Sequence, residues 1–348
     1  MTSTVKKNIQ RLFDKGHATQ RQLIEILDLN EEDAKILFDA ADQKRKDVVG
    51  DGVHLRAIVE FSSACRCFCA YCGLNAGNKN ISRYSMSDDA ILSAVDTAHE
   101  AGYRTVVLQS GEDLSFTQAR VCALVQKIKQ SYPDMAVTLS LGERPKEDYL
   151  AFKAAGADRY LIKHETSDPK IYRLLHPDST LEKRLEATRN LIDAGFQTGG
   201  GFMIGLPGQT HATIADDLLL LQKLNLRMAG IGPFIPHAAT PLRHVPAGDI
   251  FLSLKSVALA RLILPRALVP ATSSLNILSG DVTLALKVGA NVLMQKAEPE
   301  NFRKMYEIYP KPLDGSALSD IRKRITDKIE SIGRYVSSTR GDYGEDVW

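Results

Sequence analysis

The sequence predicts an α/β fold, a complete (β/α)8 barrel of the TIM type with helices added at both ends. Eight short runs rich in β-branched and apolar residues recur along the chain, and segments with helical periodicity separate them. Most of these runs are apolar throughout, as the strands of a parallel sheet covered by helices must be. Eight such units over roughly 240 residues fit a barrel, with a doubly wound open sheet as the alternative.

Residues 1–50 are expected to form an N-terminal helical extension. Thr19 and Gln22 make a capping box ahead of an apolar stripe, and Asn30 caps the next helical segment. The barrel is expected over residues 51–300. Its eight expected strands are Leu55–Phe61, Thr105–Gln109, Ala136–Leu141, Arg159–Lys163, Thr198–Ile204, Met228–Phe234, Val269–Thr272 and Asn291–Met294.

Helix signals stand between these strands. Ser87 caps one helix, Pro145 suits the first turn of another, and Thr210 opens a third. Ser179 with Glu182 reads as a further capping box. Residues 301–348 are expected to be a C-terminal helical extension packed on the barrel. No linker rich in Pro, Gly or Ser divides the chain, so a single domain with two extensions is predicted.

Composition excludes some functions. The chain of 348 residues carries mixed charges with a formal net charge of +2, which gives no support for a nucleic-acid or acidic-membrane partner. No apolar run is long enough to cross a bilayer, and the N-terminus lacks the apolar core of a signal peptide. A cytoplasmic location is therefore expected, and thiols stay reduced there.

The most informative stretch is SSACRCFCAYCG at Ser62–Gly73, which holds four of the five cysteines. It follows the first expected strand directly, at the face of a parallel barrel where active sites lie. A structural zinc site usually needs two separated pairs of ligands, and a disulfide is disfavoured in a reducing compartment. An iron–sulfur cluster held by thiolates is the third option. Cys65, Cys69 and Cys72 have the C-x3-C-x2-C spacing, and three ligands would leave one iron of a 4Fe-4S cube open.

These residues resemble the signature of the radical S-adenosylmethionine (SAM) enzymes, C-x3-C-x-Φ-C, with Tyr71 as the aromatic Φ. Further segments resemble the HydE family of FeFe-hydrogenase maturases, with biotin synthase and methylornithine synthase as more distant relatives. The segments that carry this resemblance are LQSGED (108–113), TLSLGERP (138–145), GADRYLIKHET (156–166), MIGLPGQT (203–210), GIGPFIPH (230–237), TPL (240–242) and YEIYP (306–310).

The resemblance implies one 4Fe-4S cluster on Cys65, Cys69 and Cys72, with SAM chelating the open iron. Reductive cleavage of SAM would then give methionine and a 5′-deoxyadenosyl radical. Cys67 lies outside the signature and is expected to be a spectator or a spare ligand, and Cys122 is expected in a helix core. The residues implied in cofactor binding are Tyr71, Gln109, Ser110, Gly111, Glu112, Ser140, Glu165 and Arg184.

Among these, Ser110–Glu112 resembles the segment that accepts the SAM ammonium, and Arg184 resembles the partner of the SAM carboxylate. Glu165 suits the ribose hydroxyls, because a carboxylate accepts two hydrogen bonds. Each has a plain structural alternative: a turn, a surface ion pair or an exposed helix arginine.

Substrate contacts are expected inside the barrel. Arg159, Lys163 and Glu165 alternate on one face of the fourth strand, so this face is expected to line the cavity. Arg159 resembles a carboxylate-binding position of the family, and Lys163 stands where the family often has Arg. Packing or a solvated charge is the alternative for all the proposed substrate residues, namely Arg159, Lys163, Met228, Thr272, Ser273 and Tyr306.

Two departures from the family pattern bear on substrate and cofactors. No cysteine follows Cys122, so thiolates cannot hold a second cluster near the C-terminus, as in some HydE proteins. The segment Ser273–Asn291 also lacks an arginine expected before the last strand.

The resemblance implies a role in assembling the hydrogenase diiron site. The substrate would be an iron complex bearing cysteine, carbonyl and cyanide. The partners would be other maturases and an electron donor such as ferredoxin or flavodoxin. The alternatives are a related enzyme acting on a free amino acid or other small molecule, and a non-enzymatic iron–sulfur or zinc scaffold.

Overall fold

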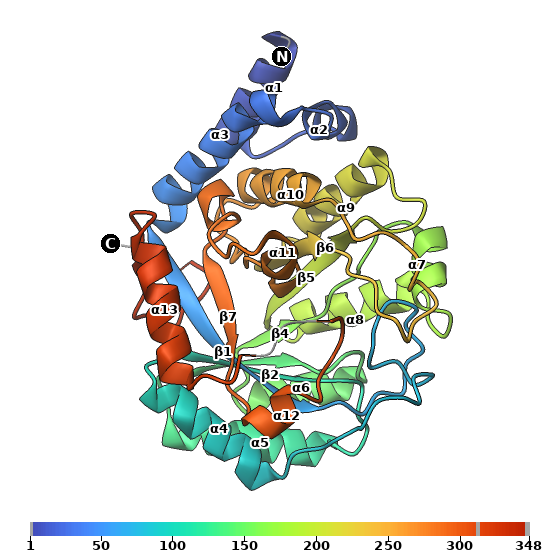
Figure 1. The fold of residues 1–348 in the computed structure, drawn as a ribbon, viewed down its shortest axis with the longest axis vertical. Helices are drawn as coiled ribbons and strands as arrows, with labels where there is room; N and C mark the ends of the chain where they lie inside the picture. The colour runs from blue at the N-terminus through green and yellow to red at the C-terminus, as the bar shows by residue number, and fades with distance from the viewer. Residues whose placement is uncertain (1–2, 311–313, 345–348) are drawn as a thin grey trace.

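Three helices precede the first strand in this computed structural model, which describes residues 3–310 and 314–344. They are α1 (Ser3–Lys15), α2 (Gln20–Leu27) and α3 (Glu31–Val49). The predicted capping box is confirmed, because Thr19 and Gln22 exchange side-chain and backbone hydrogen bonds. Asn30 likewise accepts from the amide of Asp33. The three helices lie together at one end of the molecule, over α9 and α10 (Figure 1).

Seven parallel strands form one curled sheet, in the order β6-β5-β4-β3-β2-β1-β7. A short additional strand, β8 (Tyr335–Val336), pairs with the start of β1. The seven strands are β1 (Gly52–Ser62), β2 (Thr105–Ser110), β3 (Ala136–Ser140), β4 (Arg159–Leu161), β5 (Gln197–Ile204), β6 (Met228–Pro233) and β7 (Val292–Lys296).

The predicted complete barrel of eight regular strands is corrected at one place. The expected strand Val269–Thr272 makes only one isolated bridge, from Pro270 to Val292, and the adjoining Leu268 makes another to Met228. Pro270 has no backbone N–H to donate, which prevents a continuous ladder at this position. The structure is therefore a curled parallel sheet with β6 and β7 at its edges, and an irregular segment runs between them.

Helices cover the outer side of the sheet, as expected for an α/β fold (Figure 1). Ser87 and Thr210 cap α4 and α9 as predicted, whereas α8 is capped by Thr180 and not by the expected box at Ser179. The bounds are α4 (Asp88–Glu100), α5 (Gln118–Ser131), α6 (Lys146–Ala154), α7 (Pro169–Leu175), α8 (Leu181–Asp193), α9 (His211–Lys223), α10 (Ile250–Ile263), α11 (Ser273–Ser279), a 3-10 turn at Leu286–Val288, α12 (Glu300–Arg303) and α13 (Leu318–Glu330).

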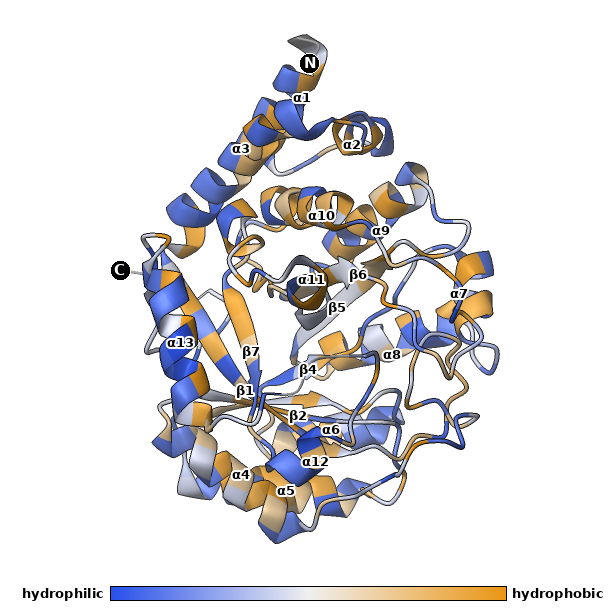
Figure 2. Ribbon diagram, viewed as in Figure 1, coloured by the Kyte–Doolittle hydropathy of each residue, from blue (hydrophilic) through white to orange (hydrophobic). Residues whose placement is uncertain are grey.

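The main apolar core lies between the sheet and these helices. Alternate residues of β1, from Leu55 to Phe61, belong to this core together with the inner stripes of α4 and α5. The intervening residues of β1 point to the other side of the sheet, into the concave interior. Helix α10 is buried along most of its length and is coloured hydrophobic in Figure 2. Among the described residues, no helix is both long and apolar enough to cross a membrane.

The segment after α13 runs across the amino-terminal ends of the strands. The amide of Ser337 donates to the carbonyl of Val53, and the hydroxyl of Thr105 donates to the carbonyl of Arg340. This places the C-terminal segment on the opposite side of the sheet from the loops that follow the strands.

Candidate active site

The cysteine-bearing loop leaves the carboxyl end of β1 and runs to α4. Arg83 organises it, because its guanidinium donates to the carbonyls of Ser63, Leu74 and Asn75 within the loop. The amide of Ala70 donates to the carbonyl of Leu175, which fastens the loop to the end of α7. In Figure 1 this is the long blue loop beside α7, at the opposite side of the view from the C-terminus.

The three signature thiols are partly buried and free. The amide of Glu112 donates to Sγ of Cys65 at 3.4 Å, and Nδ1 of His176 lies 3.4 Å from Sγ of Cys69. Burial raises the pKa of Cys72 to about 12. Because a thiolate is the metal-binding form, a bound cation must hold this buried sulfur deprotonated.

The donor set, three free thiols on one loop, suits an iron–sulfur cluster. Each thiolate of a cluster binds a different iron, so its ligands need not converge. Short contacts between N–H groups and sulfur, such as the one at Cys65, also tune iron–sulfur centres.

Cys67 lies among the signature thiols. Its sulfur is in hydrogen-bonding contact with those of Cys65 and Cys69, and its carbonyl accepts from the amide of Ala76. The expectation that it is a spectator stays a prediction. Cys122 is partly buried and packs against the main core, in line with its predicted place on α5.

The segment Ser110–Glu112 lies directly against the cysteine loop. A Cβ on Gly111 would fall 2.2 Å from the carbonyl oxygen of Ala64 and 2.7 Å from Cβ of Cys65, so only glycine fits. Glu112 accepts from Nε of Arg66 at 3.1 Å and from the amide of Glu143 at 2.8 Å. Gln109 and Ser140 stand opposite each other at the ends of β2 and β3. The structure therefore brings these five predicted cofactor residues, Gln109, Ser110, Gly111, Glu112 and Ser140, to the strand ends beside the cysteines.

Glu165 and Arg184 lie on the neighbouring elements. Glu165 is buried and has φ of +64°, a left-handed backbone conformation that a non-glycine residue adopts at a cost. Nζ of Lys163 lies 2.9 Å from its carboxylate. Arg184 is also buried, which excludes the exposed helix arginine considered from the sequence. Its guanidinium donates to Glu143 at 2.6 Å and to the carbonyl of Lys163 at 2.5 Å.

Electrostatics link these groups to Tyr71. Burial lowers the pKa of Arg184, but Tyr172 and Glu143 outweigh this effect, so the net shift is upward. Burial and the nearby Glu165 raise the pKa of Tyr71, which keeps the phenol protonated. Tyr71, Glu165 and Arg184 therefore share one environment at the loop.

The predicted substrate residues divide into two groups. Tyr306 is buried and hydrogen-bonded to the side chain of Gln109, at the same end of the sheet as the cysteines. The hydroxyl of Thr272 donates to the carbonyl of Ile231, and the side chain of Ser273 pairs with Tyr309. Met228 lies deeper, in a buried cluster with Leu161, Leu268 and Val292.

Arg159 is not brought to this site. Its side chain is fully buried at the start of β4, where Nη2 lies 2.6 Å from Asp342 and donates to the carbonyls of Arg340 and Gly341. A strand's alternation gives the face of a residue but not its height along the barrel axis. The interior position predicted for Arg159 therefore lies at the far end from the cysteine loop, against the C-terminal segment.

Sequence reasoning missed an interior arginine and an interior acidic pair. Arg56 is fully buried, and its Nη1 lies 3.2 Å from Sδ of Met228. Its Nε and Nη2 have no hydrogen-bond partner among the described residues. At the end of the same strand, Glu60 is buried beside Glu298, with Lys296 bound to it. The sequence does contain a signal for these interior charges, because Arg56 and Glu60 interrupt the otherwise apolar run Leu55–Phe61.

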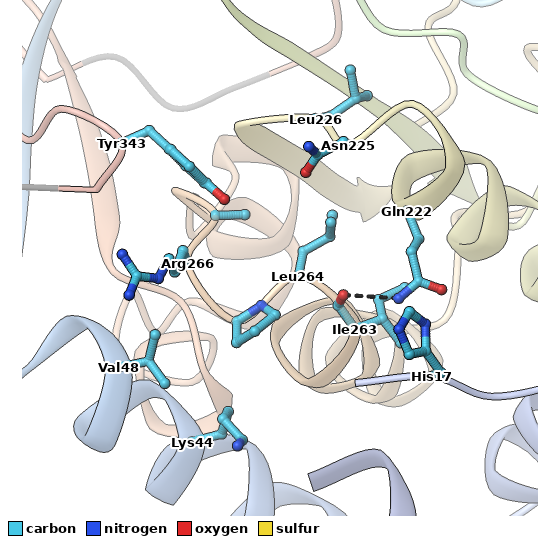
Figure 3. A pocket seen from close by; sticks show the side chains of 12 residues that line it. His17, Lys44, Val48, Gln222, Asn225, Leu226, Ile263, Leu264, Arg266 and Tyr343 are labelled. Atoms are coloured by element: carbon cyan, nitrogen blue, oxygen red, sulfur yellow. Dashed lines mark hydrogen bonds between the residues drawn. The ribbon is translucent and has the colours of Figure 1, made fainter. Parts of the chain in front are cut away.

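A separate hollow of about 440 Å³ lies away from the cysteine loop (Figure 3). It opens between the N-terminal helices, the end of α10 and the C-terminal segment; Tyr343 faces into it and Lys44 is among the residues that line it. None of the predicted site residues lines it.

Comparisons with known proteins identify the family of this chain. The family model described as the Radical SAM superfamily matches residues 59–221, which include the cysteine loop and the ends of β2 to β5. The [FeFe] hydrogenase maturase subunit HydE of Thermotoga maritima is 44% identical over 306 residues, covering 87% of each chain. The 3-methylornithine synthase of Methanosarcina acetivorans is 27% identical over 266 residues, covering 76% of this chain and 75% of that protein. Biotin synthases are also among its relatives.

The fold has solved counterparts too. The crystal structure of methylornithine synthase (PylB) superposes with a TM-score of 0.83 and 24% identity, covering 95% of this chain and 97% of that one. At that identity the likeness shows the fold, whereas the maturase subunit shows the closer kinship. The chain is therefore an enzyme of the radical SAM superfamily and belongs, within it, to the family of the [FeFe] hydrogenase maturase subunit HydE.

Proposed function

We propose that this enzyme cleaves SAM reductively and acts in assembly of the diiron site of FeFe-hydrogenase. Kinship with a hydrogenase maturase subunit over 87% of the chain supports the pathway. The observation that carries the chemistry is the contact between the Gly111 segment and Cys65, which no larger residue would permit. It sets a candidate SAM-binding edge directly beside the candidate cluster ligands.

In this proposal Cys65, Cys69 and Cys72 hold three irons of a single 4Fe-4S cluster. These thiolates would hold the cluster, which would supply the one electron needed to cleave SAM into methionine and a 5′-deoxyadenosyl radical. One cluster is proposed because no cysteine follows Cys122. A cytoplasmic location, where thiols stay reduced, belongs to the same proposal.

The chain's own residues bind and orient SAM. Ser110–Glu112 and Ser140 present polar groups at the strand ends, where the ammonium would lie. Arg184 is buried and permanently charged, so it suits the SAM carboxylate. Glu165 is held in a strained conformation that aims its carboxylate beside Lys163, which suits the ribose hydroxyls. The left-handed turn at Glu165 costs stability, which is typical of binding sites.

The interior of the curled sheet is proposed as the substrate chamber. Lys163, Thr272 and Tyr306 lie toward the cysteine end of it, and Met228 lies deeper. Buried walls exclude water, which a carbon radical requires. An iron complex on the way to the diiron site is the proposed substrate, with other maturases as partners. In this scheme residues 51–300 form the catalytic body, and residues 1–50 and 301–348 are extensions.

Anaerobic assay of 5′-deoxyadenosine tests the chemistry. The protein is reconstituted with iron and sulfide, reduced with dithionite, and compared with Cys67→Ala and Cys69→Ala. We expect activity in wild type and Cys67→Ala, and none in Cys69→Ala, which removes a ligand. Loss in Cys67→Ala as well would overturn the ligand assignment. If the reconstituted wild type never cleaves SAM, the proposed enzymatic function is wrong and the alternative of an iron–sulfur scaffold is favoured.

A further inference from the structure

The surface over the candidate cluster has an unusual charge. Between Phe61 and Ser87 the chain contains Arg66, Lys79 and Arg83 but no aspartate or glutamate. Arg83 is used inside the loop. Arg66 and Lys79 are exposed. The loop that carries the candidate ligands therefore presents only positive charge of its own to solvent.

An exposed aromatic ring marks the same loop. Phe68 lies between Cys67 and Cys69 in the sequence, and its residue is 53% exposed. Leu174, at the end of α7, is 48% exposed, and α7 is fastened to the loop through the hydrogen bond from Ala70 to Leu175. Two large apolar side chains are thus left in water on segments that are fastened together at the candidate cluster loop.

Two further segments add cations around Phe68. The amide of Leu242 donates to the carbonyl of Ala70, which brings the exposed Arg243 to the loop. Arg173 is exposed on α7 next to Leu174. Within the part of the chain that the structure describes, Lys79, Arg173 and Arg243 form no ion pair with a carboxylate. Each donates one hydrogen bond, to Ala76, Ser179 and His244 respectively.

Acidic groups nearby are few and engaged. Glu112 is mostly buried and paired with Arg66. Asp178 is exposed, and its carboxylate accepts from the amide of Phe68. Glu307 lies at the flank of the loop, paired with His237. The exposed charges on these segments are therefore mainly positive, and two large exposed apolar side chains lie on the same segments; apolar and charged groups also combine at transient interfaces.

We propose that this surface docks an acidic one-electron carrier protein. The surface, here named the cluster-loop face, consists of Arg66, Phe68, Lys79, Arg173, Leu174 and Arg243. The inference rests on the proposed function, because only an enzyme whose cluster must be reduced needs such a partner. One electron leaves the carrier, which is oxidised, and enters the cluster on Cys65, Cys69 and Cys72. No bond forms and no proton moves.

The choice of an acidic partner follows from the charges. Lys79, Arg173 and Arg243, which have no carboxylate partner among the described residues, raise the rate of encounter with a negatively charged protein, and this effect weakens with salt. The path for the electron would also be short, since Phe68 is adjacent in sequence to the proposed cluster ligand Cys69. A carrier seated there lies closer to the cluster than one seated on any face at the strand starts.

Charge reversal tests the proposal in the full-length, reconstituted enzyme. The variant is Lys79→Glu/Arg173→Glu/Arg243→Glu, none of which touches the proposed SAM or cluster residues. The matched control is Lys35→Glu/Lys127→Glu/Lys223→Glu, three exposed lysines on α3, α5 and α9 with the same change in charge. Each protein is reduced either with dithionite or with a purified acidic ferredoxin. Ferredoxin binding is also titrated directly at low and high salt.

We expect the triple variant to bind ferredoxin at least about tenfold more weakly at low salt, and to turn over correspondingly more slowly with it. With dithionite it should match wild type, and the control should match wild type in every arm. Equal ferredoxin binding by the variant and wild type, or an equal loss in the control, overturns the docking surface. Failure of wild type to cleave SAM even with dithionite overturns the proposed function instead, and the binding titration still decides the surface.

Discussion

At the scale of single residues, the site depends on backbone positions that only certain side chains tolerate. Gly111 allows β2 to approach the cysteine loop within van der Waals contact. Glu165 takes a left-handed conformation that glycine would adopt more easily, so its carboxylate is kept there in spite of the strain. Both features concentrate at the carboxyl ends of the strands, where the cofactor site is proposed.

Gly111→Ala is expected to lose the cluster before it loses the fold. The added Cβ would lie 2.2 Å from the oxygen of Ala64, so the cysteine loop must move. Overpacking of this kind costs about 1–3 kcal/mol, too little to unfold a protein of this size. Iron and sulfide content after reconstitution, together with the thermal unfolding midpoint, checks this expectation. The control is Gly315→Ala, whose Cβ would meet nothing nearer than 3.6 Å; iron loss there would refute the local cause.

At the scale of elements, the ends of β1 and β7 bring two carboxyl groups together inside the sheet. Glu298 follows the end of β7 and is fully buried, and Glu60 lies beside it at the end of β1. Lys296, the last residue of β7, pairs with both carboxylates. Burial, and next the charge of Glu60, raise the pKa of Glu298 from an ordinary 4.5 to about 7. A parallel pairing of distant segments thus raises the pKa of a carboxyl group that lies near Lys296 and Tyr84.

This pair predicts a pH-dependent stability. A carboxyl group with a raised folded pKa stabilises the protein fully below its unfolded value, and this contribution is lost as the pH rises through the folded value. The free energy of unfolding of wild type is therefore expected to fall between about pH 5 and pH 8. Glu298→Gln should show a smaller fall, measured by urea unfolding at several pH values. Glu182→Gln, on the exposed side of α8, should show the same fall in unfolding free energy with pH as wild type. If Glu298→Gln shows that same fall, a group other than Glu298 causes it.

At the scale of the whole molecule, the two ends of the curled sheet have separate tasks. The loops after the strands carry the candidate active site, and the C-terminal segment closes the strand starts. Asp342 is central to that closure, because it pairs with the buried Arg159 and accepts from Gln197 at 3.0 Å. Although burial raises the pKa of Asp342, Arg159 and the other donors outweigh it and hold this pKa below its ordinary value.

Asp342→Asn is expected to lower the free energy of unfolding at pH 7 by about 2 kcal/mol, since it removes the charged acceptor of a hydrogen bond from the buried Arg159 guanidinium. A depressed carboxyl pKa contributes stability above the unfolded value of about 3.9 and loses it as the pH falls further. The difference between variant and wild type should therefore shrink as the pH falls below about 3.9, measured by guanidinium unfolding at several pH values. Asp134→Asn, on the exposed surface, should change little. SAM cleavage should survive in Asp342→Asn, and its loss would contradict the separation of the two ends.

The sequence by itself determined the α/β alternation, most strand positions, several caps and the signature of three cysteines. These are local properties: periodicity, capping and ligand spacing act within a few residues. The tertiary structure alone decided where those elements meet. Arg159 binds Asp342, a partner 183 residues away in the sequence. Pro270 prevents a regular eighth strand. Glycine is required at position 111 only because the cysteine loop packs against it. Contacts between distant segments depend on the height of each residue along the sheet, which spacing within one strand does not encode.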